Sequence, residues 1–369
     1  MDLHLNSEQE LLREGLTKFL ATRYDLAESR AAAKTGAGWQ PDIWRGFADE
    51  LGILGATLPE DDGGLGGGAV EVMVIAEALG HALVIEPFVN TAVVASGLLH
   101  RAGGDSATAV LAEIASGTAI VALADGPDDQ ASAVRQDDGW LLTGAKFVVA
   151  DAPLATHLLL TADVDGDTAL FLTEFDAAAP AAGLTVHDFR TIDDRRAADL
   201  EFDGWRLPAD ALIGAGGDTA ASLARAHDEG ATAVCAEAVG GMRKVLADTV
   251  DYAKQRHQFG QAIGTFQVLQ HRMVDMYMEV EQAAAATLLA VLHLDAEPDT
   301  RARTVSAAKA TVGRAARFVG QNAVQLHGGM GMTEELAIGH YFKRLTAVQY
   351  EFGSTDFHVN RYAALTTAQ

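Results

Sequence analysis

The sequence predicts an α+β protein in which two helical regions flank a region of short strands. Apolar residues recur at helical spacing over residues 1–116, and long helical patterns return over residues 215–369. Residues 117–214 hold short β-prone runs separated by Gly, Asp and Pro, and these runs do not alternate with helices. We therefore expect an N-terminal helical domain, a middle β-barrel or sandwich domain, and a C-terminal helical bundle with these boundaries.

The N-terminal region is expected to contain several helices and one glycine-rich loop. Ser7 followed by Glu10 has the pattern of a capping box, ahead of a helix that carries Leu16 and Leu20 on one face. Further helices are expected from about residue 42, over residues 69–83 and over residues 91–99. Residues 58–68 form the expected loop, because Pro and Gly break both helix and strand.

Short β-prone runs define the middle region, and long helical runs define the C-terminal one. The β-prone runs cover residues 119–124, 140–143, 147–149, 157–162, 169–173, 184–186 and 198–202. From Thr219 the pattern returns to helix, and Gly260 and Gly264 interrupt it before a long run over residues 266–294. A further run covers residues 305–325. Long helices with apolar stripes and short links are typical of a helical bundle.

The composition argues against nucleic acid as a partner. The chain has 369 residues, 49% of them hydrophobic, and a net charge of −24. That length suits two or three packed layers. Arg195-Arg196 and Lys343-Arg344 are too short to make the basic patch that a phosphate backbone needs. An anionic ligand would require a local group of donors, because the overall field repels it.

Neither a membrane span nor a metal site is predicted. No stretch of about 20 apolar residues is present, and the first 13 residues contain acids where a secretory signal would be basic and then apolar. The single cysteine, Cys235, suits a reducing cytoplasm and a core position in its alanine-rich helix. The 12 histidines show no metal-binding spacing. We therefore expect a cytoplasmic protein with no metal.

A first motif runs from Arg256 through Phe259 and Gly260 to Gln267. It places a basic residue at a helix end, then a glycine-bearing turn, then the start of another helix. Such a turn and helix start can supply donors to a phosphate. The same residues also suit an ordinary corner between two helices.

A second motif covers residues 325–335 and contains Gly328, Gly329 and Gly331. Glycines let the backbone approach a ligand closely. The segment is not a Rossmann fingerprint, because it follows a helix and lacks the third glycine. A helix C-terminus followed by a turn is the simpler alternative.

Together these segments resemble the acyl-CoA dehydrogenase family. The family pattern R-x-x-F-G-x-x-I-x-x-F-Q-x-x-Q is matched by Arg256, Phe259, Gly260, Ile263, Phe266, Gln267 and Gln270. The pattern Q-x-x-G-G-x-G-x-T-x-E is matched by Gln325, Gly328, Gly329, Gly331, Thr333 and Glu335. Weaker matches are the P-E-x-x-G-G-L-G loop at residues 59–66 and the closing β strand at residues 202–208. The matches follow the family order over roughly residues 10–360.

The resemblance implies two helical domains around a β domain, and a tetramer with FAD between its subunits. In the family, both motifs contact the adenine-diphosphate half of a flavin that a neighbouring subunit holds. Carried over, Arg256 would pair with the pyrophosphate, and Phe259 would pack on the dinucleotide portion. Gln325 and Gly329 would hold the ribose and diphosphate region. The expected cofactor-binding set is completed by Gln258, Gln267 and Gly328.

Two departures from the family pattern lie in the middle region. The T-E-P-x-A-G-S-D loop, which touches flavin and substrate in the family, reads Leu123-Ala124-Asp125-Gly126-Pro127-Asp128-Asp129-Gln130 here. In the K-x-W-I-T/S-N strand, Val148 stands for the Trp and Ala150 for the hydroxyl residue. The chain thus keeps the segments that would contact a neighbouring subunit's flavin. It lacks side chains that would hold a flavin in its own β domain. This favours a heteromer with about one flavin per pair; the alternative is a homotetramer in which backbone donors replace those side chains.

The catalytic base has three open assignments. The reaction needs a carboxylate that removes the α-proton of the acyl group while a hydride leaves the β-carbon. The family commonly places it in Y-E-G-T, and Tyr350-Glu351 matches if one residue is inserted before Gly353. Some relatives carry it on the first long C-terminal helix, where Gly230 takes the position and Glu229 lies about 100° around the helix. The third assignment is that this chain holds no base.

The activity that the resemblance implies is FAD-dependent α,β-dehydrogenation of an acyl-CoA thioester to a 2-enoyl-CoA, as in fatty acid metabolism. Electrons would pass to an electron-transfer flavoprotein. Two other functions stay open. The chain could be a non-catalytic partner subunit that completes a neighbour's flavin site, or a flavin oxidase or monooxygenase on the same fold.

Overall fold

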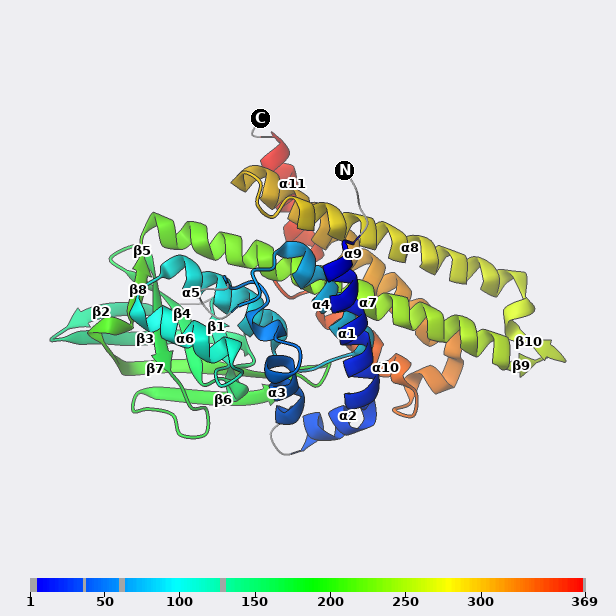
Figure 1. The fold of residues 1–369 in the computed structure, drawn as a ribbon, viewed down its shortest axis with the longest axis horizontal. Coiled ribbons are helices and arrows are strands. Elements are labelled where there is room, and N and C mark those ends of the chain that lie inside the picture. The colour runs from blue at the N-terminus through cyan, green and yellow to red at the C-terminus, as the bar shows by residue number, and fades with distance from the viewer. Residues whose placement is uncertain (1–4, 36–37, 60–63, 127–130, 368–369) are drawn as a thin grey trace. The chain divides into compact units, whose positions relative to one another are not determined.

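A computed structural model describes residues 5–35, 38–59, 64–126 and 131–367 (Figure 1). Parts of two predicted loops, residues 60–63 and 127–130, lie outside the described residues. The chain divides into two compact units. The first holds the N-terminal helix, Ala69–Val84 and the chain from Ala231 onward, and the second holds Ser29–Gly68 and Ile85–Gly230. The predicted domain boundaries stay a prediction, but the predicted order of helical, β and helical regions is confirmed.

The first unit is built from helices. They are α1 (Ser7–Arg23), α4 (Ala69–Ala82), most of α7 (Gly217–Gln255), α8 (Gln267–Leu292), α9 (Pro298–His327), α10 (Ala337–Ala347) and α11 (Thr355–Thr367). A short hairpin of β9 (His257–Gln258) and β10 (Gln261–Ala262) separates α7 from α8. The helix predicted from residue 305 begins earlier, because Pro298 is well suited to a first helical turn.

The start of α1 differs by one residue from the predicted capping box. Asn6, not Ser7, is the N-cap, and its side chain accepts the backbone N–H of Gln9 at 2.9 Å. The Gln9 side chain in return accepts the backbone N–H of Asn6 at 3.0 Å. The box predicted for Ser7 and Glu10 is therefore wrong in register, because Asn caps as well as Ser and Gln can take the place of Glu.

Helices α4 and α7 cross at two glycines. A Cβ atom on Gly80 would lie 1.9 Å from the carbonyl oxygen of Glu237, and one on Gly240 would lie 1.9 Å from that of Glu77. Both positions exclude any side chain, so the two helix backbones meet directly. This contact fixes the place of Glu237 on α7.

The second unit is built around one eight-stranded mixed sheet, with the order β6-β7-β3-β2-β4-β5-β8 and β1 paired with β4. The strands are β1 (Val121–Ala124), β2 (Ser132–Gln136), β3 (Gly139–Ala150), β4 (His157–Val164), β5 (Asp167–Glu174), β6 (Leu184–Arg190), β7 (Arg196–Pro208) and β8 (Leu212–Ala215). Strands β1 and β4 run parallel, and most other pairs are antiparallel. The runs predicted separately at residues 140–143 and 147–149 are one strand, β3, interrupted by a bulge.

Apart from the first turns of α7 and short 3₁₀ turns between strands, the helices of the second unit precede the sheet in the chain. They are α2 (Leu26–Lys34, which begins in the first unit), α3 (Pro41–Asp49), the 3₁₀ turn η1 (Ile53–Gly55), the π-helix η3 (Val89–Ala95), α5 (Ser96–Ala102) and α6 (Asp105–Ala115). The helix predicted over residues 91–99 is thus part π-helix. The buried hydroxyl of Thr91 donates to the Val121 carbonyl at 3.2 Å and accepts its N–H at 3.2 Å. This pair of bonds ties η3 to β1.

None of the helices that the structure describes has the length and apolarity needed to cross a membrane.

Glu86 is a buried carboxyl group in the second unit. Its Oε1 accepts the backbone N–H of Gln40 at 3.1 Å, and its Oε2 is buried with no hydrogen-bond partner among the described residues. Burial raises the pKa of Glu86 from 4.5 to about 7, although Arg30 and Arg195 act to lower it. The cost of ionising this group inside the protein makes the fold sensitive to pH.

Replacing Glu86 with Gln should stabilise the protein above about pH 7. Because the folded pKa lies above the unfolded one, the favourable contribution of Glu86 is complete below pH 4.5 and is lost as the pH rises through about 7. The difference between the folded and unfolded pKa values of Glu86 corresponds to roughly 3 kcal/mol in free energy of unfolding. Urea unfolding at pH 5 and pH 8 measures the difference, with exposed Glu50→Gln as control. If Glu86→Gln and wild type differ in free energy of unfolding by the same amount at pH 5 and pH 8, the raised pKa assigned to Glu86 is wrong.

Candidate active site

The hairpin β9–β10 lies at the end of α7 (Figure 1). The Arg256 N–H donates to the Tyr252 carbonyl at 2.8 Å, and the Ile263 N–H donates to the Arg256 carbonyl at 2.8 Å, which closes the loop. At its tip Phe259 has a φ of +55° and Gly260 a φ of +82°. The Phe259 ring lies 6.2 Å from the Phe266 ring, yet the residue is 92% exposed. A bulky residue in this strained conformation, facing solvent, indicates a surface that binds something.

The second predicted segment begins where α9 ends. Gly328 follows His327 with a φ of +60°, a conformation that glycine adopts without strain. A Cβ atom built on Gly328 or on Gly329 would meet nothing within 4 Å. The backbone at both residues is therefore open to a ligand.

The structure brings the two predicted segments together within the first unit. The Tyr252 ring stacks on the His327 ring with centroids 4.3 Å apart, and the Tyr252 hydroxyl donates to the His327 carbonyl at 3.4 Å. Tyr252 lies one helical turn before Arg256, and His327 directly precedes Gly328. Segments 75 residues apart in the sequence are thus neighbours.

All of the residues predicted to bind cofactor are exposed. They are Arg256, Gln258, Phe259, Gln267, Gln325, Gly328 and Gly329. Gln267 is the first residue of α8, so the positive end of that helix dipole lies here as well. A guanidinium, amides, open backbone N–H groups and an exposed ring fit the diphosphate and ring systems of a dinucleotide such as FAD.

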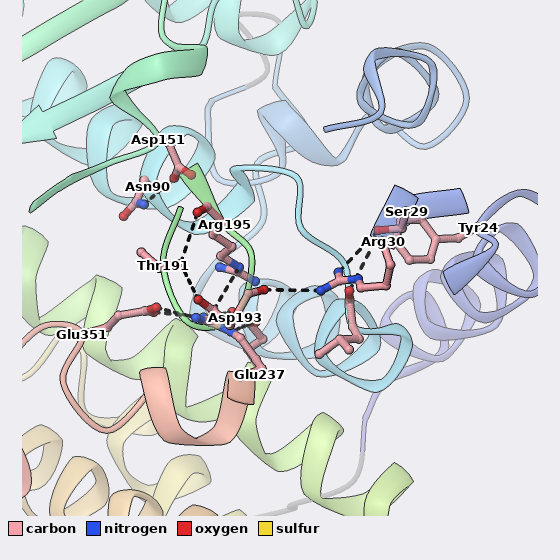
Figure 2. Close-up of polar contacts among 12 residues, drawn as sticks. Tyr24, Ser29, Arg30, Asn90, Asp151, Thr191, Asp193, Arg195, Glu237 and Glu351 are labelled. Atoms are coloured by element: carbon pink, nitrogen blue, oxygen red, sulfur yellow. Dashed lines mark hydrogen bonds and ion pairs between the residues drawn. The ribbon is translucent and has the colours of Figure 1, made fainter. Parts of the chain in front are cut away.

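Glu351, the first candidate base, is labelled in Figure 2, and its carboxylate is bound to the buried side chain of Arg344. Its two carboxylate oxygens accept hydrogen bonds from Nη1 and Nη2 of Arg344, the second at 2.9 Å. Arg344 also donates from Nε and Nη2 to the two oxygens of Glu237, at 2.7 Å and 2.9 Å. The side chains of Glu237 and Arg344 are 5% and 6% exposed, and that of Glu351 is 32% exposed. One guanidinium therefore holds two carboxylates.

A second buried cation, Lys309, binds the turn that carries Glu351. Nζ of Lys309 donates to the carbonyl oxygens of Val348 at 2.9 Å, Gly353 at 3.0 Å and Gln349 at 3.4 Å. Burial lowers the pKa of Lys309 from its ordinary value, with Arg344 acting in the same direction. The turn thus depends on a lysine that solvent does not reach.

Glu229, the second candidate base, lies in the other unit. Its Oε1 accepts hydrogen bonds from Arg101 at 3.0 Å and from Arg225 at 2.9 Å, and its side chain is 15% exposed. Both candidate carboxylates are therefore paired with arginine, but Glu351 is the more accessible of the two.

The strand corresponding to the family's ring-facing segment is irregular. Val148 lies in the bulge of β3 with a φ of +52° and is 61% exposed. Its N–H donates to the Asp199 carboxylate on β7 at 2.7 Å. Beyond the strand, Asn90 donates to the Asp151 carboxylate at 2.6 Å (Figure 2). Val148 and Ala150 both face solvent, but neither offers the hydroxyl or indole group of the family pattern.

A chain of polar groups that the sequence reasoning missed lies in the same unit. Nζ of buried Lys146 donates to the Thr161 hydroxyl at 2.9 Å, which donates to Asp125 at 2.8 Å. The other Asp125 oxygen lies 2.9 Å from Nε2 of His227. Burial acts to raise the pKa of Asp125, but the hydrogen bond and charge of His227, with Thr161 and Lys146, lower it overall. Asp125 thus joins the altered loop to β4 and α7 directly, and to Lys146 on β3 through Thr161.

Sequence reasoning also missed Arg344, Glu237 and Lys309. A usable signal existed for Lys309, which lies among alanines on an otherwise apolar stripe of α9, since lysine is rarely buried without partners. The buried position of Cys235 is confirmed, and burial raises the pKa of its thiol to about 12. In the parts of the chain that the structure describes, no group of His, Cys, Asp or Glu side chains is placed to hold a metal ion.

Replacing Lys309 with Met should destabilise the turn that carries Glu351. The change leaves buried carbonyl groups without a donor, which costs about 2–4 kcal/mol in free energy of unfolding. It should also raise the amide hydrogen exchange of residues 348–353. Lys254→Met is the control, because Lys254 makes an exposed ion pair with Asp251 worth less than about 1 kcal/mol. Equal effects of the two substitutions would rule out the role given to Lys309.

Comparison with known proteins identifies the family. The descriptions "Acyl-CoA dehydrogenase, N-terminal domain" and "Acyl-CoA dehydrogenase, C-terminal domain" match residues 6–118 and 221–365. The acyl-CoA dehydrogenase IpdE2 of Mycobacterium tuberculosis is 32% identical, over 91% of this chain and 90% of that protein.

Solved structures agree with this assignment. The ChsE4-ChsE5 complex of Mycobacterium tuberculosis is similar with a TM-score of 0.91 and 25% identity, over 100% of both chains. A variant of the steroid ACAD Tcur3481-Tcur3483 is similar with a TM-score of 0.87 and 27% identity, over 98% of both chains. The predicted fold class and the predicted resemblance are confirmed. This chain belongs to the acyl-CoA dehydrogenase family.

Proposed function

We propose that this chain carries out FAD-dependent α,β-dehydrogenation of an acyl-CoA thioester in the cytoplasm. The observation that carries the proposal is the exposed set of anion donors and the Phe259 ring, which the Tyr252–His327 stack brings to one region of the first unit. FAD, when bound, supplies the acceptor for the hydride that leaves the β-carbon. Electrons then pass to an electron-transfer flavoprotein.

The residues of the hairpin and of the α9 end would hold the cofactor. Arg256 pairs with the diphosphate, Phe259 covers the dinucleotide, and Gln325 and Gly329 donate to the ribose and diphosphate. Gln258, Gln267 and Gly328 add further donors. Since these groups are all exposed, they suit a flavin that a neighbouring chain holds, and we therefore propose a tetramer.

Glu351 is the base in this proposal. Its carboxylate is more accessible than that of Glu229, which is 15% exposed and accepts from two arginines. It lies on a turn whose backbone Lys309 holds in place. Glu351 would take the α-proton of the acyl group on a carboxylate oxygen.

A second candidate function is that of a non-catalytic partner subunit. Val148 and Ala150 lack the side chains that hold a flavin ring in the family pattern, while the residues lent to a neighbour are retained. One of the similar solved structures is that of the ChsE4-ChsE5 complex. In this second candidate the chain forms a heteromer with another acyl-CoA dehydrogenase-like chain and holds about one flavin per pair.

Replacing Arg256 with Ala should give a folded protein that is poor in FAD. Loss of a charge-assisted bond of about 1.5–3 kcal/mol corresponds to a roughly tenfold or greater loss of FAD affinity. Flavin absorbance per protein and far-UV circular dichroism measure the two properties. Arg272→Ala, at an exposed position on α8, is the control. Full flavin retention in the Arg256 variant would remove its role in diphosphate binding.

The two candidate functions differ in flavin content and in assembly. The chain should be oligomeric by light scattering, because the groups that it offers act on a neighbour's flavin. A homo-oligomer with one FAD per chain, bleached anaerobically by an acyl-CoA, supports the dehydrogenase. A flavin-free chain that gains FAD only with a co-expressed partner supports the heteromer. The substrates tried should include a steroid acyl-CoA, because one similar structure is a steroid ACAD.

A further inference from the structure

The two carboxylates on Arg344 are held unequally. Glu237 accepts from both Nε and Nη2 and is 5% exposed, so it is a buried and permanent partner. Glu351 accepts from Nη1 and Nη2, and its side chain is 32% exposed. Figure 2 shows Glu237 and Glu351 on separate segments of the chain. The more exposed of the two carboxylates is the one that can leave.

Glu237 limits the free-energy cost of releasing the Glu351 carboxylate from Arg344. A buried guanidinium that loses its last carboxylate is strongly destabilised, because the remaining charge is neither hydrated nor paired. When Glu351 leaves, Arg344 keeps its bonds of 2.7 Å and 2.9 Å to Glu237. The cation stays paired, and the Arg344–Glu237 pair that remains has a net charge of zero.

The backbone of the turn does not need to move. Lys309 fixes the carbonyls of Val348 and Gly353 on either side of Glu351. The next residue, Phe352, packs against a buried cluster that includes Val305 and Leu294. Rotation of the Glu351 side chain is therefore sufficient to release its carboxylate.

We propose that Arg344 is the resting place of the Glu351 carboxylate and that Glu237 is a positioning residue that permits its release to the acyl substrate. This inference rests on the proposed dehydrogenation. In the step, a Glu351 oxygen takes the α-proton, and the electron pair of the Cα–H bond becomes the second bond between Cα and Cβ. The hydride leaves Cβ with its electron pair to the flavin oxidant. Glu351 ends as a carboxylic acid and returns its proton to solvent.

The test compares Glu237→Gln with the double variant Glu237→Gln/Arg344→Gln. With Glu237 neutral, more of the charge of Arg344 acts on Glu351 and holds its carboxylate back. The double variant removes that charge without leaving a carboxylate buried alone. A panel of straight-chain and steroid acyl-CoA thioesters is first tested for the one that bleaches the wild-type flavin fastest. The FAD-loaded assembly is then incubated with that thioester in D₂O without oxygen. Deuterium at the α-carbon of recovered thioester is measured by mass spectrometry, beside flavin content and the Kd of the thioester.

We expect Glu237→Gln to exchange the α-hydrogen about tenfold more slowly than wild type, equal to about 1.4 kcal/mol, while its Kd changes less than about twofold. Exchange in the double variant should be at least about fivefold faster than in Glu237→Gln. Glu281→Gln, exposed on α8, is the control and should exchange as wild type does. If Glu237→Gln does not fold, a double variant that exchanges less than about one tenth as fast as wild type overturns the proposal.

Other outcomes distinguish failure of the resting-place proposal from failure of the proposed function. Wild-type exchange and bleaching with no change in Glu237→Gln overturn the resting-place proposal and leave the dehydrogenase intact. Undiminished exchange in Glu351→Gln shows that another group is the base, which overturns the proposal as well. If no thioester bleaches the flavin of the wild-type assembly, the proposed function fails and the inference fails with it.

Discussion

The helical unit depends on two buried cations that hold one turn. Arg344 binds the carboxylates of Glu237 and Glu351, and Lys309 binds the carbonyls of the same turn. A buried charge is tolerated only where its partners are complete, so each cation specifies the geometry around it. The close crossing of α4 and α7 at Gly80 and Gly240 fixes the backbone that carries Glu237. Packing of small residues and pairing of buried charges thus act at the same place.

The net charge of the chain acts against the proposed binding of a diphosphate. A net charge of −24 repels a diphosphate at long range, so affinity has to come from close contacts. In the proposed site, Arg256, the start of α8 and the open backbone at Gly328 and Gly329 would provide such contacts in one region. The Tyr252–His327 stack is what makes this a single surface and not two distant ones.

Sequence reasoning predicted what depends on local pattern. The helical periodicity of α4 and α8 and the order of helical and β regions could be read directly, and so could the two glycine motifs. The sequence predicts a strand break at residues 144–146, but these residues pair with β7, and the bulge at Val148 lies inside the second predicted run. The Arg344–Glu237 pair could not be predicted, since it joins residues 107 apart on different helices. The same holds for the bond between Asp125 and His227, which joins a loop to a distant helix.

The exposed Phe259 bears on how the protein is made in the cell. A chain newly released from the ribosome carries this ring and the apolar side chains of α8, such as Val268 and Tyr277, in contact with water. Such surface is a target for chaperones and proteases until another chain covers it. In the proposed heteromer, synthesis of the two subunits in matched amounts would shorten that interval. The groups that would complete a neighbour's flavin site would then also set how long an orphan subunit survives.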